Sequence, residues 1–201
     1  MDLKLKGKTA LVLASSKGLG KATAIKLAQE EAKVMISSRN QRELEKTANE
    51  IRTKTSAEVT FHPCDLTDGK QIEELVRVTV ETFGTIDILV NNAGGPPAGT
   101  FDDFDDDDWI FAFELNLLSV VRTIRAVLPY MRKQKSGRIV NITSSSVKQS
   151  LDHLILSNTF RIGVMGLAKS LSQELAKDDI LINTVGPGKI ATDRLKELDG
   201  K

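Results

Sequence analysis

Two glycines, Gly18 and Gly20, follow a short apolar run and open a stretch with helical spacing. The loop before them is built from small residues and one lysine, in the order Leu13-Ala14-Ser15-Ser16-Lys17-Gly18-Leu19-Gly20. Small residues let a chain turn sharply and approach a diphosphate, while the helix that follows offers oriented N–H groups and a positive dipole. The loop predicts a phosphate-binding turn between strand and helix. A plain turn is the alternative, because two glycines alone are a weak signal.

A cation stands where such folds place the residue that contacts the ribose of a dinucleotide. Arg39 lies 19 residues after Gly20, and dinucleotide folds carry an acid about 20 residues after the glycines to bind the 2′-hydroxyl. A guanidinium suits a 2′-phosphate and offers no hydrogen-bond acceptor. Lys17 could reach the same phosphate. The pair favours NADP, with NAD as the second choice. The alternative is that both are solvated surface charges.

Short apolar runs alternate with helical stretches along the chain. We expect strands at residues 9–13, 33–37, 59–62, 86–90, 138–142 and 180–185, and helices at 20–31, 41–53, 68–83, 108–134 and 158–177. Pro129 predicts a kink or an early end in the long helix. Largely apolar strands separated by helices indicate a parallel sheet covered on both faces, with right-handed crossovers. The predicted fold class is α/β, a Rossmann-like doubly wound parallel sheet forming a single domain over residues 1–201.

The composition argues against several classes of function. The net charge is +1, so neither nucleic acid nor a membrane surface is an expected partner. Aromatic residues make up 4%, too few for a base-stacking surface. No apolar run approaches the roughly 20 residues that span a bilayer, and the first residues lack the apolar core of a signal peptide. The one cysteine, Cys64, cannot form an internal disulfide. A cytoplasmic location is expected.

Six aspartates lie between Phe101 and Trp109. Calcium-binding loops space their ligands and contain a glycine turn, which this run lacks. Aspartates favour the positive N-terminal end of a helix. The run therefore predicts the start of the long helix, and no metal site is expected.

Several segments together resemble the short-chain dehydrogenase/reductase family, and the resemblance covers the whole chain. The glycine loop is similar to the family's TGxxxGxG, with Leu13 and Ala14 in place of the Thr and first Gly. Further matches are Cys64-Asp65-Leu66 after the third strand, Asn91-Asn92-Ala93-Gly94 after the fourth, and the segment from Asn183 to Thr192 that packs on the nicotinamide. The loop, the cation and the resemblance together imply that the coenzyme is held by Ala14, Ser16, Lys17, Gly18, Leu19, Gly20, Arg39, Asp65, Leu66, Asn92, Ala93, Gly94, Pro187, Gly188, Ile190 and Thr192.

The resemblance also indicates the catalytic positions, and two of them carry unexpected residues. Asn116 matches the catalytic Asn of the long helix, and Ser144 matches the catalytic Ser. The family's YxxxK begins 13 residues after that Ser, which places Ser157 at the Tyr position and Arg161 at the Lys position. The segment from Gly163 to Leu171 fixes this register. The only tyrosine, Tyr130, lies 14 residues before Ser144 and is expected to be structural.

These substitutions leave three interpretations open. An alcohol is far less acidic than a phenol with pKa near 10, and losing a general acid–base group commonly costs about 10²- to 10⁴-fold in rate. Arg161 can bond ribose hydroxyls but does not deprotonate. The first interpretation is a reductase for a small carbonyl or alcohol substrate, with His153 as the rearranged acid or else a solvated loop histidine. The second is a coenzyme-binding sensor or oligomer partner with little dehydrogenase activity. The third is an enzyme doing lyase or isomerase chemistry in the same site.

The resemblance further implies a substrate loop, a helix and a seventh strand after the sixth, so we expect the chain ending at Lys201 to be incomplete. Family members pair through the helices that begin here near residues 108 and 158, which implies a homodimer or homotetramer. The apolar faces of these helices include Phe113, Leu117, Val121, Ile124, Leu167 and Leu171.

Overall fold

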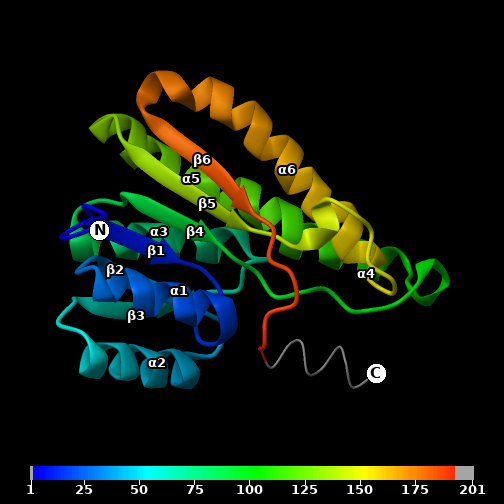
Figure 1. Cartoon of the computed structure of the whole chain (residues 1–201), viewed down its shortest axis with the longest axis horizontal. Helices are drawn as coiled ribbons and strands as arrows, with labels where there is room; N and C mark the ends of the chain where they lie inside the picture. Colours follow the sequence, from blue (N-terminus) through cyan, green and yellow to red (C-terminus); the bar gives the residue numbers. More distant parts are fainter. Residues whose placement is uncertain (1, 193–201) are drawn as a thin grey trace.

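A computed structural model describes residues 2–192 and contains a six-stranded parallel sheet. The strand order is β3-β2-β1-β4-β5-β6 (Figure 1). This order, in which the chain runs outward in both directions from β1 and β4, defines the Rossmann fold, so the predicted fold class is confirmed. The strands are β1 (Thr9–Val12), β2 (Lys33–Ser38), β3 (Val59–Pro63), β4 (Ile88–Asn91), β5 (Gly137–Ile142) and β6 (Ile180–Val185).

Helices cover both faces of the sheet and bury the apolar strands. Helices α1 (Gly18–Gln29) and α2 (Gln41–Lys54) enclose one core with Ala10, Val34 and Ile88. Helices α3 (Gly69–Phe83), α5 (Ser119–Gln134) and α6 (Ile155–Leu175) contribute to the other, which contains Leu11 and Leu89. Burial on both faces is the reason the strands are largely apolar rather than alternating. Within the described range, every helix is too short or too polar to cross a bilayer.

Polar side chains fix where several helices begin. Asn40 accepts a hydrogen bond from the Glu43 N–H at the start of α2, and Asp68 accepts from two N–H groups at the start of α3. Asp105 and Asp108 form a reciprocal capping box that opens α4 (Asp106–Phe113). The prediction that the aspartate run starts a helix is confirmed, because these carboxylates satisfy N–H groups that have no partner inside the helix.

The predicted long helix is not continuous. Helix α4 ends at Phe113, a π turn spans Glu114–Leu118, and α5 follows directly. Pro129 does not end α5, which continues to Gln134. Pro129 is exposed, so the hydrogen bond it removes lies on the solvent side, where water can replace it. Several boundaries also differ from prediction by two or three residues: α6 begins at Ile155, β4 at Ile88, α1 at Gly18 and α4 at Asp106.

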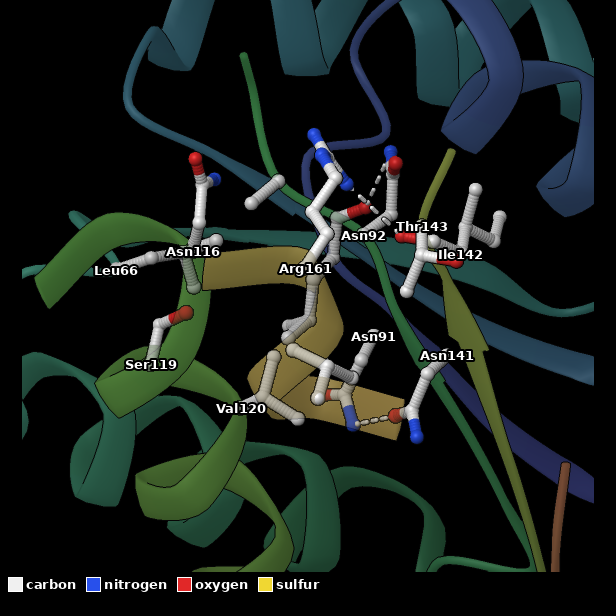
Figure 2. Close-up of a pocket in the computed structure, with 13 residues that line it drawn as sticks. Leu66, Asn91, Asn92, Asn116, Ser119, Val120, Asn141, Ile142, Thr143 and Arg161 are labelled. Atoms are coloured by element: carbon white, nitrogen blue, oxygen red, sulfur yellow. Dashed lines mark hydrogen bonds between the residues drawn. The ribbon is translucent and has the colours of Figure 1, made fainter. Parts of the chain in front are cut away.

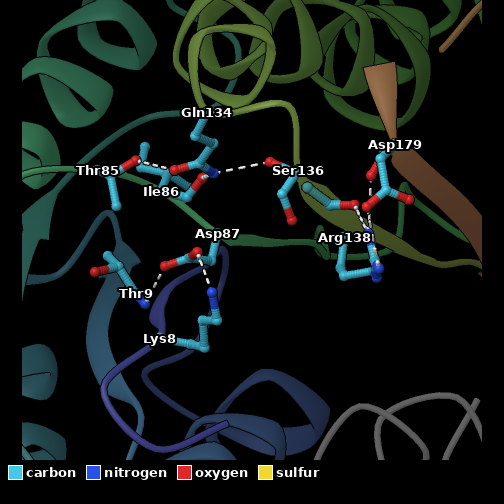
Figure 3. Close-up of polar contacts among 10 residues, drawn as sticks. Lys8, Thr9, Thr85, Ile86, Asp87, Gln134, Ser136, Arg138 and Asp179 are labelled. Carbon is cyan, nitrogen blue, oxygen red and sulfur yellow. Dashed lines mark hydrogen bonds and ion pairs between the residues drawn. The ribbon is translucent and has the colours of Figure 1, made fainter. Parts of the chain in front are cut away.

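The amino ends of the strands are joined by side-chain hydrogen bonds (Figure 3). Asp87 accepts from the Lys8 ammonium at 3.0 Å and from the Thr9 N–H at 2.9 Å. Gln134 donates to the carbonyls of Ile86 and Ser136, at 3.1 and 2.8 Å. These contacts tie the end of α5 and the N-terminal segment to the start of β4. They lie at the edge of the sheet opposite the glycine loop.

Candidate functional site

The candidate site lies at the carboxyl edge of the sheet, where β1 and β4 are neighbours. The chain leaves these strands toward opposite sides of the sheet, which opens a crevice outside their carboxyl ends. The glycine loop follows β1, and Asn92 to Gly94 follow β4. Figure 1 shows the segment after β6 crossing this edge toward the start of α1. There the Thr192 methyl lies 3.9 Å from where a side chain at Gly18 would begin.

The glycine loop makes a tight turn into α1. Gly18 adopts the left-handed conformation at φ +59°. A side chain at Gly20 would collide with the Ala14 carbonyl and would lie 2.9 Å from the Asn92 amide nitrogen. Lys17, at the N-cap of α1, gives the helix no side-chain cap. The first-turn N–H groups therefore have no capping side chain, which is the arrangement that binds a phosphate.

Neighbouring elements hold the loop in place. The Ser15 hydroxyl donates to the Val12 carbonyl at 2.7 Å, and the Asn92 amide donates to the Ala14 carbonyl at 3.1 Å. From α2, the Thr47 hydroxyl donates to the Ser16 carbonyl at 2.8 Å. Sequence reasoning missed Ser15 and Thr47. The Thr47 contact joins segments far apart in the chain, and the Ser15 bond to Val12 is one that any serine in a loop can make, so neither residue type carries a signal.

The predicted adenosine residues follow β2 and β3, except Lys17, which lies in the glycine loop after β1. Arg39 and Lys17 are both exposed. Asp65 accepts hydrogen bonds from the Thr67 N–H and hydroxyl, at 3.0 and 2.8 Å, which folds the chain after β3 into a compact loop. Leu66 in this loop is buried. The exposed cations Arg39 and Lys17 are compatible with a bound phosphate, and the buried Leu66 is compatible with an adenine ring.

One pocket brings together five of the predicted residues (Figure 2). They are Leu66, Asn92, Ala93, Asn116 and Arg161. The π turn supplies Asn116, whose amide nitrogen donates to the Gly94 carbonyl at 2.9 Å. Asn116 is 3% exposed, and its side-chain oxygen has no hydrogen-bond partner within the described part of the chain. A buried acceptor without a partner costs free energy, so it marks a place for a donor from a water or a ligand.

Two buried asparagines that line this pocket, Asn91 and Asn141, belong to a chain of hydrogen bonds, and Figure 2 shows the bond between them. The Thr123 hydroxyl of α5 donates to Asn91 at 2.7 Å, and Asn91 donates to Asn141 at 2.8 Å. Both asparagines are nearly inaccessible to solvent. These hydrogen bonds link α5 to β4 and β5 near the carboxyl ends of the two strands. Sequence reasoning gave Asn141 and Thr123 no role, because no local pattern indicates which buried polar residues meet across a sheet.

The two substituted positions contact each other. Ser157 is buried on α6, and its hydroxyl oxygen accepts a hydrogen bond from Arg161 Nε at 3.0 Å. Arg161 Nη1 also lies 3.4 Å from the Ile142 carbonyl at the end of β5. Ser144 caps the short turn Ser145–Val147, and its oxygen accepts from the Ser146 N–H at 3.1 Å. Arg161 thus anchors Ser157 close to the end of β5, just before Ser144.

His153 borders a different pocket. It is exposed at φ +55°, and its carbonyl accepts from the Gly99 N–H at 2.7 Å. Its neighbours in that pocket include Asn158 and Thr159. On a helix of 3.6 residues per turn, Thr159 faces away from the side that carries Ser157 and Arg161. The structure therefore does not place His153 with the Asn116 pocket.

The remaining predicted residues follow β6. The Pro187 carbonyl accepts from the Ser145 N–H at 2.8 Å, while Gly188 and Ile190 are exposed.

Burial, helped by the negative charge of Asp65, raises the pKa of the Cys64 thiol to about 12. Cys64 therefore stays protonated near neutral pH and does not act as a nucleophile.

Comparison with known proteins agrees with this geometry. A family model described as short chain dehydrogenase matches residues 8–201. A variant of actinorhodin polyketide ketoreductase, solved with NADPH, is 34% identical with a TM-score of 0.93, covering 100% of this chain and 77% of that one. L-Sorbose reductase from Gluconobacter frateurii, solved with NADPH and L-sorbose, is 32% identical with a TM-score of 0.93, covering 96% and 73%. An uncharacterized oxidoreductase of Staphylococcus aureus (strain MW2) is 31% identical over 188 residues, 94% of this chain and 80% of the relative. With this fold, this loop and these matches, the chain belongs to the short chain dehydrogenase family.

Proposed function

We propose that this protein is an NADP-dependent oxidoreductase that moves a hydride between the coenzyme and a small carbonyl or alcohol substrate. The observation that carries the proposal is the cradle at the start of α1, where a side chain at Gly20 would collide with Ala14 and where α1 lacks a side-chain cap. Relatives solved with NADPH support the choice of coenzyme. So do the exposed cations Arg39 and Lys17.

The residues around the cradle fit a dinucleotide from end to end. When bound, the coenzyme supplies the hydride or accepts it. The chain's own groups would bind its parts in order along the carboxyl edge. In our proposal, the loop from Ala14 to Gly20 holds the diphosphate, and Arg39 with Lys17 holds the 2′-phosphate. Asp65 and Leu66 meet the adenine, and the nicotinamide half lies against Asn92, Ala93, Gly94, Pro187, Gly188, Ile190 and Thr192.

Proton handling would fall to Asn116, Ser144 and Ser157, with Arg161 as a fixed cation that donates a hydrogen bond to Ser157. The free side-chain oxygen of Asn116 would hold a water. Because the Ser157 oxygen already accepts from Arg161, its own proton is free to point toward a substrate oxygen. A serine hydroxyl remains a poor acid, so we expect turnover about 10²- to 10⁴-fold below that of an enzyme with a tyrosine at this position.

A charge reversal at Arg39 tests the choice of coenzyme. Arg39→Asp should weaken NADPH binding by at least about tenfold and improve NADH binding, because a carboxylate repels a 2′-phosphate and accepts from a ribose hydroxyl. Energy transfer from Trp109, the only tryptophan, to the bound reduced coenzyme provides the measurement. Lys133→Asp, exposed at the far end of α5, is the matched control. Wild-type protein that binds neither nucleotide would refute the proposed function.

The hydrogen bond from Arg161 to Ser157 favours a second candidate, a coenzyme-binding protein with little dehydrogenase activity. The double change Ser157→Tyr with Arg161→Lys installs the family's pair and separates the two functions. If the wild type reduces a panel of ketones slowly and the variant accelerates it, the protein is a reductase. If the wild type binds NADPH but turns over no ketone or alcohol at any pH, the second candidate holds. His153→Ala tests the remaining proton donor, since unchanged turnover removes His153 from the mechanism.

We also propose a homodimer or homotetramer formed through α4 and α6. Ile110 and Phe113 on α4 are 57% and 38% exposed, and Ile162 on α6 is 53% exposed. Ile124, expected on the same apolar face, instead lies in the core of the subunit. Ile162→Glu should reduce the mass measured by light scattering to that of a monomer. Lys46→Glu on α2 should leave that mass unchanged.

A further inference from the structure

Arg122 on α5 contacts two segments that sequence reasoning treats separately. Its Nη1 donates to the Thr67 carbonyl at 2.6 Å, in the loop between β3 and α3. Its Nη2 lies 4.0 Å from a carboxylate oxygen of Glu114, the first residue of the π turn. A side chain at Gly69 would begin 3.4 Å from Arg122 Nε, so the guanidinium also packs on the start of α3. The side chain of Arg122 is 26% exposed.

The loop contacted by Arg122 contains the proposed adenine residues. Asp65 accepts both hydrogen bonds of Thr67, and the Asp65 N–H donates to Gln71 at 2.9 Å. These bonds determine the shape of the loop. The Arg122 bond determines something different, which is the position of the loop relative to α5. A charge-assisted bond to a partly buried carbonyl is stronger than a neutral one, so it can hold this position.

The other segment carries Asn116. Asn116 lies two residues after Glu114 in the π turn, and its amide is bonded to the Gly94 carbonyl after β4. Leu66 and Asn116 line one pocket and lie near each other in Figure 2. Arg122 therefore links two segments that line this pocket. One is the loop of residues 64–68, which carries Leu66, and the other is the π turn, which carries Asn116.

We propose that Arg122 is a positioning residue for the coenzyme. It holds the loop of residues 64–68 against α5, so that Asp65 and Leu66 meet the adenine while the π turn presents Asn116. The proposal rests on the proposed function, because it assigns Arg122 a part in binding NADP. Lysine is a poor substitute, since one ammonium group cannot repeat the planar fork that reaches Thr67, Gly69 and Glu114 together.

Calorimetry with NADPH and with 2′,5′-ADP tests the proposal, because the second ligand contains only the adenosine half. Arg122→Met should weaken both ligands by the same factor, about tenfold. Arg122→Lys should give a smaller loss, and Glu114→Gln the smallest. Arg125→Met is the matched control, since Arg125 is exposed on the same helix, and it should bind both ligands as the wild type does. A purely structural role would lower the melting temperature and leave the affinity of the folded protein unchanged.

Folded Arg122→Met that binds both ligands within about twofold of the wild type would overturn the proposal. If that variant does not fold, unchanged affinity in both Arg122→Lys and Glu114→Gln would overturn it equally. Hydrogen exchange of the unliganded protein separates this failure from failure of the proposed function. Amides of residues 65–68 should exchange faster in Arg122→Lys than in the wild type, whether or not a nucleotide binds. Equal exchange rates would mean that Arg122 does not hold the loop.

Discussion

Ala14 occupies a backbone conformation that the family's glycine would adopt without strain. Its φ is +45°, in the left-handed region, where a β-carbon costs roughly 1–2 kcal/mol. Its carbonyl accepts the bond from Asn92 that closes the cradle. The sequence identifies the glycine that is missing at this position. It does not reveal that the alanine keeps the glycine's conformation, because only the surrounding contacts enforce it.

Ala14→Gly should therefore stabilise the protein. Relief of the strain outweighs the greater freedom of glycine in the unfolded chain, and we expect a gain of about 1 kcal/mol in the free energy of unfolding. Urea titration measures it. Ala22→Gly, exposed in the middle of α1, is the control and should lose about 1 kcal/mol. A less stable Ala14→Gly protein would show that Ala14 is not strained.

At the scale of helices and strands, hydrophobic periodicity predicts which elements are present but does not predict where a helix is interrupted. All six strands lie where apolar runs predict them. The division of the long helix at Glu114–Leu118 was missed. A π turn contains one more residue than an α-helical turn and requires no particular residue types, so the local sequence pattern does not show it. The predicted start of α6, at residue 158, lies three residues later than the observed start at Ile155.

Helices α1 and α2 are joined by an ion-pair network centred on Glu50. Its carboxylate lies 2.6 Å from the Lys21 ammonium and 2.8 Å from that of Lys54. Hydrogen bonds from these lysines lower the pKa of Glu50 from 4.5 to about 2. A carboxyl whose pKa is lower in the folded state stabilises the protein above its unfolded pKa. This contribution disappears as the pH falls from about 4.5 to about 2.

Glu50→Gln should consequently lower stability near neutral pH, and the difference from the wild type should vanish at the acid end of that window. Urea titrations near pH 7, 4 and 2 measure the difference. Because the pair is partly exposed, added salt should shrink it. Glu45→Gln, exposed on the same helix, is the control and should show a smaller, pH-independent effect. A constant difference for Glu50→Gln across the range would contradict the assignment.

Across the whole molecule, the carboxyl ends of the strands carry the candidate site, and the amino ends carry contacts that stabilise the fold. The carboxyl edge carries the glycine loop and the Asn116 pocket, and the amino edge carries the hydrogen bonds of Asp87 and Gln134 (Figure 3). The sequence allowed the first edge to be predicted, since its motifs resemble those of a known family. The second edge could not be predicted, because Gln134, Ile86 and Thr85 meet only after the fold has formed.

Gln134→Ala should destabilise the fold and leave the coenzyme site unaffected. Gln134 makes two donor bonds to carbonyls and accepts from the Thr85 hydroxyl at 2.7 Å. Losing them should cost about 2 kcal/mol, partly offset by water. Thermal unfolding and NADPH titration give the two readouts. Gln173→Ala, exposed on α6, should change neither. Weaker NADPH binding by folded Gln134→Ala would show that the edges are coupled.

The π turn also constrains how the length of this region can change. In a helix with about 3.6 residues per turn, each residue advances the direction of the side chain by about 100°. Deleting a single residue between Glu114 and Leu118 would convert the wide turn into a regular one and swing every later side chain relative to Asn116. The direction of Arg122 relative to Asn116 would then change. Homologues that keep this pocket should therefore keep Asn116 and the length of the turn, while its other positions can be substituted.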